Sequence, residues 1–148
     1  MNDYFIKEVD FDNDWYSLSK ESFDVTPTFD EFKENLTQAN ARNFGFFLNE
    51  KMIGTFTLSQ NLDNVLSKCY EINNVSIDSK LRNNGLGKIM FNSLFNLFND
   101  CNFSLNTTNA SDFYKKLGMD VLYEKDGVSY FYHNHTFLIE NKSQQNIQ

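Results

Sequence analysis

A strand-like run, a glycine-bearing turn and a helix-like run follow one another in the middle of this chain of 148 residues. They span residues 70–78, 82–87 and 86–98, and the turn reads Arg82-Asn83-Asn84-Gly85-Leu86-Gly87. Such a turn directs several backbone N–H groups at one point, beside the positive end of the helix dipole. Glycine permits the positive φ angles and the close approach that a bound phosphate requires. Taken alone, the segment fits a phosphate-binding turn and a plain connecting turn equally well.

The rest of the hydrophobic pattern predicts one mixed α/β domain around a central sheet. Strands are expected over residues 4–9, 44–48, 52–58, 68–78, 101–105, 119–124 and 128–132. Helices are expected over residues 12–23, 29–36, 86–98 and 109–117, with Asn109 as the N-cap of the last one. The order is therefore β-α-α-β-β-β-α-β-α-β-β. The domain is expected to cover residues 1–139, and residues 140–148 form a polar tail predicted to be disordered.

The strand over residues 68–78 carries an irregularity in its apolar pattern. Tyr70 and Ile72 have one parity, and Val75 and Ile77 have the other, so the parity changes across Asn73-Asn74. In a regular strand this change would exchange the buried face for the exposed face. One extra residue, a β-bulge, explains the pattern and is the favoured interpretation. A strand buried on both faces is the alternative.

Charge and composition exclude several classes of protein. The net charge is −7 and the sequence pI is about 4.7, which argues against nucleic-acid binding and favours cationic ligands such as amines. Cys69 and Cys101 form no CxxC or Cys/His cluster, so neither a metal site nor a disulfide framework is expected. No apolar run has membrane-spanning length, and no leader pattern opens the chain. A cytoplasmic protein without a membrane partner is expected.

Two motifs resemble the GNAT N-acetyltransferase superfamily. The first is Val75-x-Ile77-x-Ser79-x-x-Arg82-x-x-Gly85-x-Gly87, which is similar to the acetyl-CoA signature of that family. The second runs from Asn109 to Met119 and reads NASDFYKKLGM, similar to the family's A-x-x-F-Y-x-K-x-G-F motif. Their order, with one helix and one strand between them, makes the combination specific. The resemblance covers nearly the whole chain.

The resemblance implies a mostly antiparallel sheet of about seven strands, flanked by about four helices, whose fourth strand is bulged and splayed. It also implies acetyl-CoA as the acetyl donor and no metal. The chain departs from the pattern at Ser79, where proline is frequent, at Thr107, where asparagine is common, and at Asn83, where glycine is frequent. Asparagine tolerates left-handed backbone better than other side chains, so Asn83 preserves the turn.

The resemblance also assigns roles to residues. Tyr114 is the expected general acid, which would protonate the departing sulfur, and Glu71 is a possible general base. Alternatively, Tyr114 packs in the core and Glu71 is a solvated strand residue. A backbone N–H freed by the bulge is expected to polarise the thioester carbonyl. The residues expected to bind the cofactor are Val75, Ile77, Arg82, Asn83, Asn84, Gly85, Leu86, Gly87, Lys88, Asn106 and Asn109.

The expected activity is N-acetyl transfer from acetyl-CoA to a primary amine, by direct attack in a ternary complex. A small-molecule amine is slightly favoured over a peptide or protein amine because the chain is acidic. The alternative is a GNAT-like module that binds acyl-CoA without turnover. A dinucleotide-binding Rossmann domain does not fit, because its glycine turn follows an early strand of a parallel sheet. Either a monomer or a homodimer is compatible with the sequence.

Overall fold

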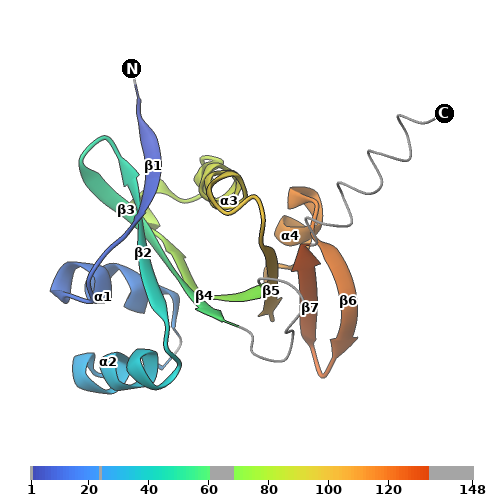
Figure 1. Ribbon diagram of the computed structural model, residues 1–148, viewed down its shortest axis with the longest axis horizontal. Coiled ribbons are helices and arrows are strands. Elements are labelled where there is room, and N and C mark those ends of the chain that lie inside the picture. Colours follow the sequence, from blue (N-terminus) through green and yellow to red (C-terminus); the bar gives the residue numbers. More distant parts are fainter. Residues whose placement is uncertain (1, 24, 61–68, 134–148) are drawn as a thin grey trace. The chain divides into compact units, whose positions relative to one another are not determined.

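The computed structural model describes residues 2–23, 25–60 and 69–133 (Figure 1). In this part of the chain, seven strands form one sheet in the order β1-β2-β3-β4-β5-β7-β6. The strands are β1 (Tyr4–Glu8), β2 (Arg42–Leu48), β3 (Lys51–Gln60), β4 (Cys69–Ile77), β5 (Asn102–Thr107), β6 (Asp120–Lys125) and β7 (Val128–His133). The polar tail expected over residues 140–148 lies outside the described residues.

Four α-helices and two short 3-10 helices complete the described elements. They are α1 (Asn13–Ser19), η1 (Lys20–Ser22), α2 (Phe29–Gln38), η2 (Ser79–Leu81), α3 (Leu86–Leu97) and α4 (Ser111–Leu117). The order of strands and α-helices agrees with the sequence-based order at every step. The first helix differs in length, because its α-helical part ends at Ser19 and a 3-10 turn continues it to Ser22.

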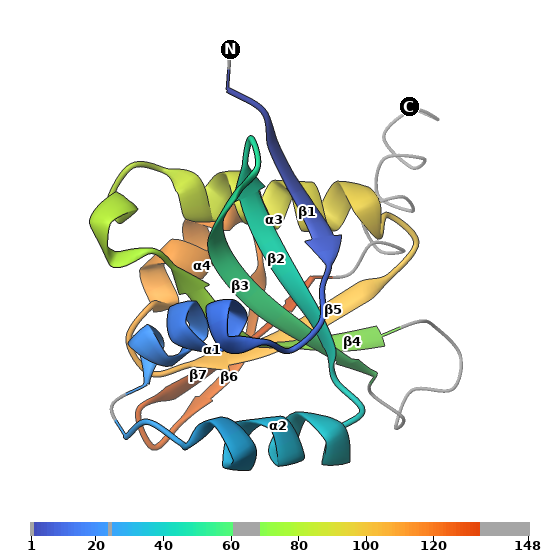
Figure 2. The ribbon, with the colours of Figure 1, turned by 90° about the vertical axis from the view of Figure 1, so that its left-hand side faces the viewer.

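The chain divides into two compact units, and β4 contributes to both. Unit 1 comprises Met1–Gln60 and Ile72–Leu97, whereas unit 2 comprises Asn61–Glu71 and Phe98–Gln148. In unit 1, α1 and α3 lie on opposite faces of the strands, with α1 in front and α3 behind in Figure 2.

Aromatic side chains fill the core of unit 1 on the side of α1. Trp15 is fully buried, packs edge-on against Phe32 at 5.5 Å between ring centroids, and donates its indole Nε1–H to the carbonyl O of Phe44 at 3.0 Å. Phe44 in turn stacks on Phe56 at 5.0 Å. Burying a large aromatic side chain while satisfying its polar N–H is strongly stabilising, so α1 is held firmly on β2.

Side chains of the preceding residues cap the starts of α1 and α2. The Asp12 carboxylate accepts a hydrogen bond from the backbone N–H of Trp15 at 2.9 Å, at the start of α1. The Thr28 hydroxyl accepts one from the backbone N–H of Glu31 at 3.2 Å, at the start of α2. Each side chain satisfies an amide that has no partner inside its helix, which is why both helices start there.

Unit 2 is built on strands that lie far apart in the sequence. β5 pairs with β7 in antiparallel orientation, and it pairs with residues 69–71 of β4 in parallel orientation. Phe103 and Phe131 are fully buried in its core. The hairpin between β6 and β7 turns at Asp126 and Gly127, whose φ angles are 54° and 79°. Two consecutive positive φ angles are typical of a type I′ turn.

Within the described residues, no helix is both long and apolar enough to cross a membrane.

Candidate active site

The 82–88 segment leads from η2 into the first turn of α3. Two of its residues have left-handed backbone, with φ of 67° at Asn83 and 75° at Gly85. Glycine adopts this conformation without strain, and asparagine does so more easily than other side chains. The conformation agrees with the expectation that Asn83 replaces a glycine in this turn.

Side chains of this segment donate to carbonyl groups of Arg82 and of two residues before the segment. Asn84 Nδ2 donates to the carbonyl O of Leu81 at 3.0 Å and of Arg82 at 3.3 Å. Arg82 Nε donates to the carbonyl O of Ile77 at 3.1 Å. Residues 82–85 are exposed, so this stretch of backbone is accessible to a ligand.

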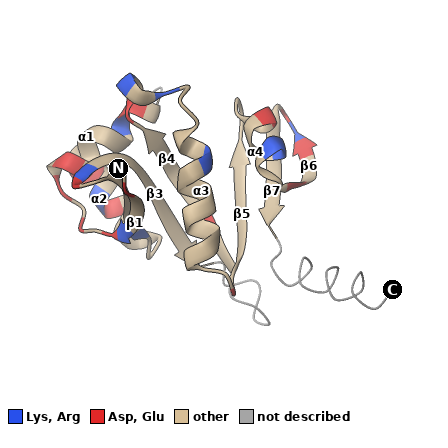
Figure 3. Cartoon of the chain, turned by 90° about the horizontal axis from the view of Figure 1, so that it is seen from above, with Lys and Arg blue, Asp and Glu red and all other residues tan. Residues whose placement is uncertain are grey.

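The N-terminus of α3 completes an environment suited to an anion. The first amides of a helix lack intrahelical partners and lie at the positive end of its dipole. No acidic side chain occupies the first turn of α3, and the exposed Lys88 adds a positive charge there (Figure 3). A lysine is unfavourable at this end of a helix unless an anion binds beside it. The residues present therefore fit the pyrophosphate of acetyl-CoA.

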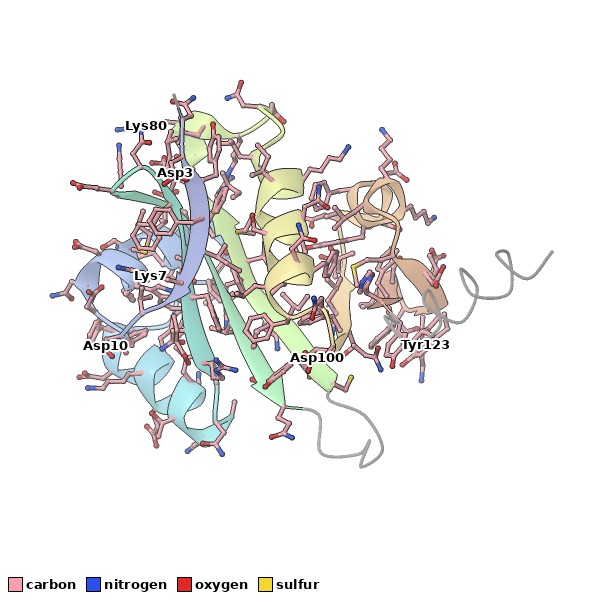
Figure 4. All side chains as sticks on the ribbon, turned by 45° about the horizontal axis from the view of Figure 1, so that its top comes forward. Asp3, Lys7, Asp10, Lys80, Asp100 and Tyr123 are labelled. Carbon is pink, nitrogen blue, oxygen red and sulfur yellow. The ribbon has the colours of Figure 1, made fainter. Side chains whose placement is uncertain are left out.

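The backbone before this segment is tied to the rest of unit 1. Asp78 N–H donates to the carbonyl O of Ile53 in β3 at 2.8 Å. Ser79 N–H donates to the Glu21 carboxylate of η1 at 3.3 Å. Lys80, exposed in η2 and labelled in Figure 4, contributes a further cation near this end of the unit. These contacts anchor the start of the 82–88 segment without using its own amides.

The irregularity predicted in β4 is present. Asn74 has a φ of 57°, which no residue of a regular strand adopts. The hydroxyls of Thr55 and Thr57 in β3 donate to the carbonyl O of Asn74 and Asn73, each at 3.2 Å. Val75, half-buried, follows directly. Most of β4 is only half-buried, so the alternative of a strand buried on both faces is not supported.

Sequence reasoning missed Thr55 and Thr57, although both contact the bulge. The sequence pattern that could have indicated them is a pair of hydroxyl residues, two positions apart, on either side of Phe56 in a mostly apolar strand. Two positions along a strand return to the same face, so the pattern places both hydroxyls together. Without knowing which strand lies beside β3, the sequence could not assign them a partner.

In unit 2, Tyr114 is buried on α4, with 7% of its surface exposed. Its ring lies 5.6 Å from the ring of Phe131 and 5.0 Å from that of Phe113, measured between centroids. Burial raises the pKa of Tyr114 to about 12, because the charged phenolate is poorly solvated there. At neutral pH the phenol is therefore protonated and able to donate a proton. Core packing and a role as a general acid are compatible in this environment.

Glu71 is half-buried in the part of β4 that belongs to unit 2. It lies opposite Ser104 of β5, which lies opposite Tyr132 of β7, so the three residues form one row on the same face. Burial raises the pKa of the Cys69 thiol, and the nearby Glu71 carboxylate raises it further. Neighbouring Tyr70 alternates to the other face, where its ring lies 5.9 Å from that of Phe98. Glu71 and Tyr70 therefore lie on opposite faces of the strand.

Asn106 and Asn109 are both exposed in unit 2. The prediction that Asn109 caps α4 is wrong, because the N-cap position is Ala110 and makes no side-chain capping hydrogen bond. Instead, the Thr107 hydroxyl accepts from the backbone N–H of Ala110 at 3.1 Å and of Asn109 at 3.4 Å. A hydroxyl two residues earlier thus replaces the predicted cap. Gly118 ends the helix in a left-handed conformation, with a φ of 99°.

The predicted site residues fall into two sets, one in each unit. The set in unit 1 is continuous in sequence from the bulge to the start of α3 and consists of Val75, Ile77 and Arg82 to Lys88. The set in unit 2 consists of Glu71, Asn106, Asn109 and Tyr114. Among the described residues, no group of three or more His, Cys, Asp or Glu side chains is arranged to hold a metal ion.

Comparison with known families shows which protein family the chain belongs to. The sequence profile of the Acetyltransferase (GNAT) family matches residues 11–119, which include β4, the 82–88 segment and α4. The chain belongs to the GNAT acetyltransferase family. The sequence resemblance is thereby confirmed. A search of curated protein sequences finds no significant match.

Solved structures of other GNAT proteins share the fold. A spermidine N-acetyltransferase from Vibrio cholerae in complex with CoA and spermine is 15% identical, with a TM-score of 0.65 over 90% of this chain and 96% of that one. A glucosamine-6-phosphate N-acetyltransferase from Arabidopsis thaliana is 17% identical, with a TM-score of 0.59 over 83% and 95%. An acetyltransferase from Thermus thermophilus is 11% identical, with a TM-score of 0.65 over 88% and 96%. At these identities the likeness shows the GNAT fold alone.

Proposed function

We propose that this GNAT protein transfers the acetyl group of acetyl-CoA to a primary amine by direct attack in a ternary complex. One observation carries the proposal. The exposed left-handed turn at Asn83 and Gly85 leads into a helix whose first turn bears Lys88 and no acidic side chain. That combination favours a phosphate group, and membership of the GNAT family supports CoA as the molecule that carries it.

In the proposed complex, the backbone amides of the 82–88 segment bind the pyrophosphate. The Arg82 and Lys88 side chains contribute positive charge beside it. Ile77 contacts the pantetheine arm through its main chain, and Val75, Asn106 and Asn109 are further candidate contacts of the donor. The Ile77 carbonyl also accepts from Arg82 Nε at 3.1 Å, so Arg82 steadies the backbone at the end of β4.

Tyr114 supplies the proton for the leaving group. As the amine nitrogen forms a bond to the acetyl carbon, the bond from that carbon to sulfur breaks, and the electron pair remains on sulfur. The phenol of Tyr114 protonates this thiolate, and the phenolate then regains a proton from solvent. The pKa of about 12 keeps the phenol protonated before each turnover.

Glu71 is proposed to accept the proton that the amine loses, directly or through a water molecule. An amine similar to lysine has a pKa of about 10.4, so it must lose a proton to become a nucleophile near neutral pH. The half-buried position of Glu71 beside Ser104 supports this role. In the absence of such a base, water alone would take the proton.

For the acceptor, a small cationic amine is proposed ahead of a peptide or protein amine. The net charge of −7 attracts cations and repels nucleic acid. The V. cholerae protein of similar fold is named for spermidine and was crystallised with spermine, which agrees with this choice. A cytoplasmic location, and a monomer or a homodimer, are proposed on the sequence alone.

The test is release of free thiol from acetyl-CoA in the presence of an amine panel. The panel contains spermidine, glucosamine 6-phosphate and a peptide with a free N-terminus, with each amine omitted in turn as the control. Amine-dependent thiol release and an acetylated product seen by mass spectrometry are expected. Tight binding of acetyl-CoA without turnover of any amine would instead support an acyl-CoA-binding module without catalysis.

A further inference from the structure

The hydrogen bonds between β3 and the bulge of β4 determine where two backbone amides point. The carbonyl groups of Asn73 and Asn74 are consecutive, and both accept from threonine hydroxyls of β3, at 3.2 Å. In a regular strand, consecutive carbonyl groups point to opposite sides. The left-handed backbone of Asn74, with a φ of 57°, turns the second carbonyl to the same side as the first.

The N–H groups of the same peptides must then point the opposite way. A trans peptide holds its C=O and N–H antiparallel in one plane, and the described residues contain no cis peptide bond. The carbonyl of Asn73 faces β3, so the N–H of Asn74 points away from β3. The carbonyl of Asn74 also faces β3, so the N–H of Val75 points away as well. Two adjacent donors therefore lie on one side of the strand, where a regular strand offers one.

Side chains of β3 hold this arrangement in place. The Thr57 hydroxyl donates to the carbonyl O of Asn73 and accepts from Asn74 Nδ2 at 3.0 Å, closing a ring around the bulge. Thr55 and Thr57 are almost fully buried, so water is not available to replace these hydrogen bonds. Leaving a buried carbonyl or hydroxyl without a partner is costly, which disfavours any other backbone conformation at Asn74.

We infer that Thr55 and Thr57 are positioning residues, which aim the N–H groups of Asn74 and Val75 at the thioester carbonyl oxygen of acetyl-CoA. The inference rests on the proposed function, because it requires acetyl-CoA as the donor. Two parallel N–H donors suit an oxygen on which negative charge develops during acetyl transfer. The hydroxyls touch neither the donor nor the acceptor and act only through the backbone of β4.

The experiment compares two ligands that differ only at this oxygen, acetyl-CoA and S-ethyl-CoA, a thioether without the carbonyl. Calorimetry gives the dissociation constant of each ligand for the wild-type protein, Thr57→Val and Thr57→Ser. Valine keeps the shape of threonine without the hydroxyl, whereas serine keeps the hydroxyl. The wild type and Thr57→Ser are expected to prefer acetyl-CoA. In Thr57→Val that preference should fall about five- to tenfold, with S-ethyl-CoA affinity unchanged.

A second readout follows the carbonyl itself. The infrared C=O stretch of bound acetyl-CoA should lie at lower frequency in the wild type than in Thr57→Val, because hydrogen bonds weaken the C=O bond. An unchanged ligand preference and an unchanged stretch in Thr57→Val would overturn the inference. Should Thr57→Val fail to fold, Asn74→Gly and Asn74→Ala take its place. Glycine accepts the positive φ and should keep more of the preference than alanine, and equal losses would overturn the inference.

These outcomes separate the inference from the proposed function. A wild-type protein that binds neither ligand contradicts acetyl-CoA as the donor, and both proposals fail together. A wild-type protein that binds both ligands equally, with no shift of the C=O stretch, leaves CoA binding intact and overturns only the paired donors.

Discussion

At the scale of single residues, Tyr114 shows how burial prepares a side chain for acid catalysis. Its ring packs against Phe131 and Phe113, and this apolar environment raises its pKa to about 12. A phenol with this pKa remains protonated at any physiological pH and is available as a donor. The same burial that contributes to the core of unit 2 therefore maintains the required protonation state.

Replacing Tyr114 with phenylalanine removes only the hydroxyl. We expect kcat to fall about a hundredfold or more, because the departing thiolate loses its proton donor. The affinity for acetyl-CoA, measured by calorimetry, should change little. Phe113→Leu, on the neighbouring exposed position, is the matched control and should leave kcat near the wild-type value. An unchanged kcat in Tyr114→Phe would remove this residue from the mechanism.

The raised pKa of Tyr114 also predicts how stability depends on pH. In the unfolded chain the phenol ionises near its ordinary pKa of 10, whereas in the folded protein it stays neutral to about 12. The contribution of the neutral Tyr114 to the free energy of unfolding is therefore fully present below pH 10. It is lost as the pH rises from about 10 to 12. Urea unfolding of the wild type and Tyr114→Phe across this range should show the steeper loss in the wild type. Parallel curves would show that Tyr114 ionises alike in both states.

At the scale of elements, the 82–88 segment combines a turn of left-handed backbone with the start of a helix. Its left-handed positions are occupied by the residue types that tolerate them, Asn83 and Gly85. A Cβ added at Gly85 would meet no atom within 4 Å, so the space around it is open. The backbone angle, rather than any neighbour, restricts which residue can stand there.

Substitutions at Gly85 can test whether the φ angle or the available space restricts this position. Gly85→Ala should destabilise the fold by about 1–2 kcal/mol, the cost of left-handed backbone for an ordinary residue. Gly85→Asn, although larger, should cost less because asparagine tolerates that conformation. Denaturant unfolding measures both variants. A larger loss for asparagine than for alanine would mean that side-chain volume, not the φ angle, limits this position.

The elements also show where sequence reasoning succeeded and where it failed. Gly118, Thr28 and the Asp126-Gly127 turn act through their own backbone or nearest neighbours, and roles of this kind can be read from local sequence. The prediction that Asn109 caps α4 was wrong because Thr107, two residues earlier, accepts from the amides at the start of that helix. Several polar residues within hydrogen-bonding reach of one helix start cannot be ranked from sequence alone.

At the scale of the whole molecule, the charge of −7 sets the long-range field that a ligand meets. A field of this sign attracts a cationic amine and opposes the anionic CoA, so the donor must be bound by local groups such as the 82–88 amides. The two substrates of the proposed reaction therefore depend on different features of the protein. Binding of the amine depends on the net charge of the protein, and binding of CoA depends on the geometry of the 82–88 segment.

If the acceptor is attracted by net charge, salt should affect a cationic acceptor and leave a neutral one unaffected. Raising the ionic strength from about 0.01 M to about 1 M shortens the screening length from about 30 Å to about 3 Å. The KM for spermidine should rise several-fold over this range, because attraction of the trivalent cation is screened. The KM for a neutral amine acceptor, such as hydroxylamine, should stay nearly constant. Steady-state kinetics at both extremes provide the measurement, and equal responses of the two acceptors would exclude steering by the acidic field.

The sequence by itself determined the order of the elements, the family and the bulge in β4. Each of these is written in local periodicity or in a contiguous motif, such as the parity change across Asn73-Asn74. Only the tertiary structure showed that β3 lies beside that bulge, with Thr55 and Thr57 hydrogen-bonded to its carbonyl groups. The physical reason is that strand pairing joins residues far apart in the chain. A side chain's partner across a sheet has no signature in its own neighbourhood.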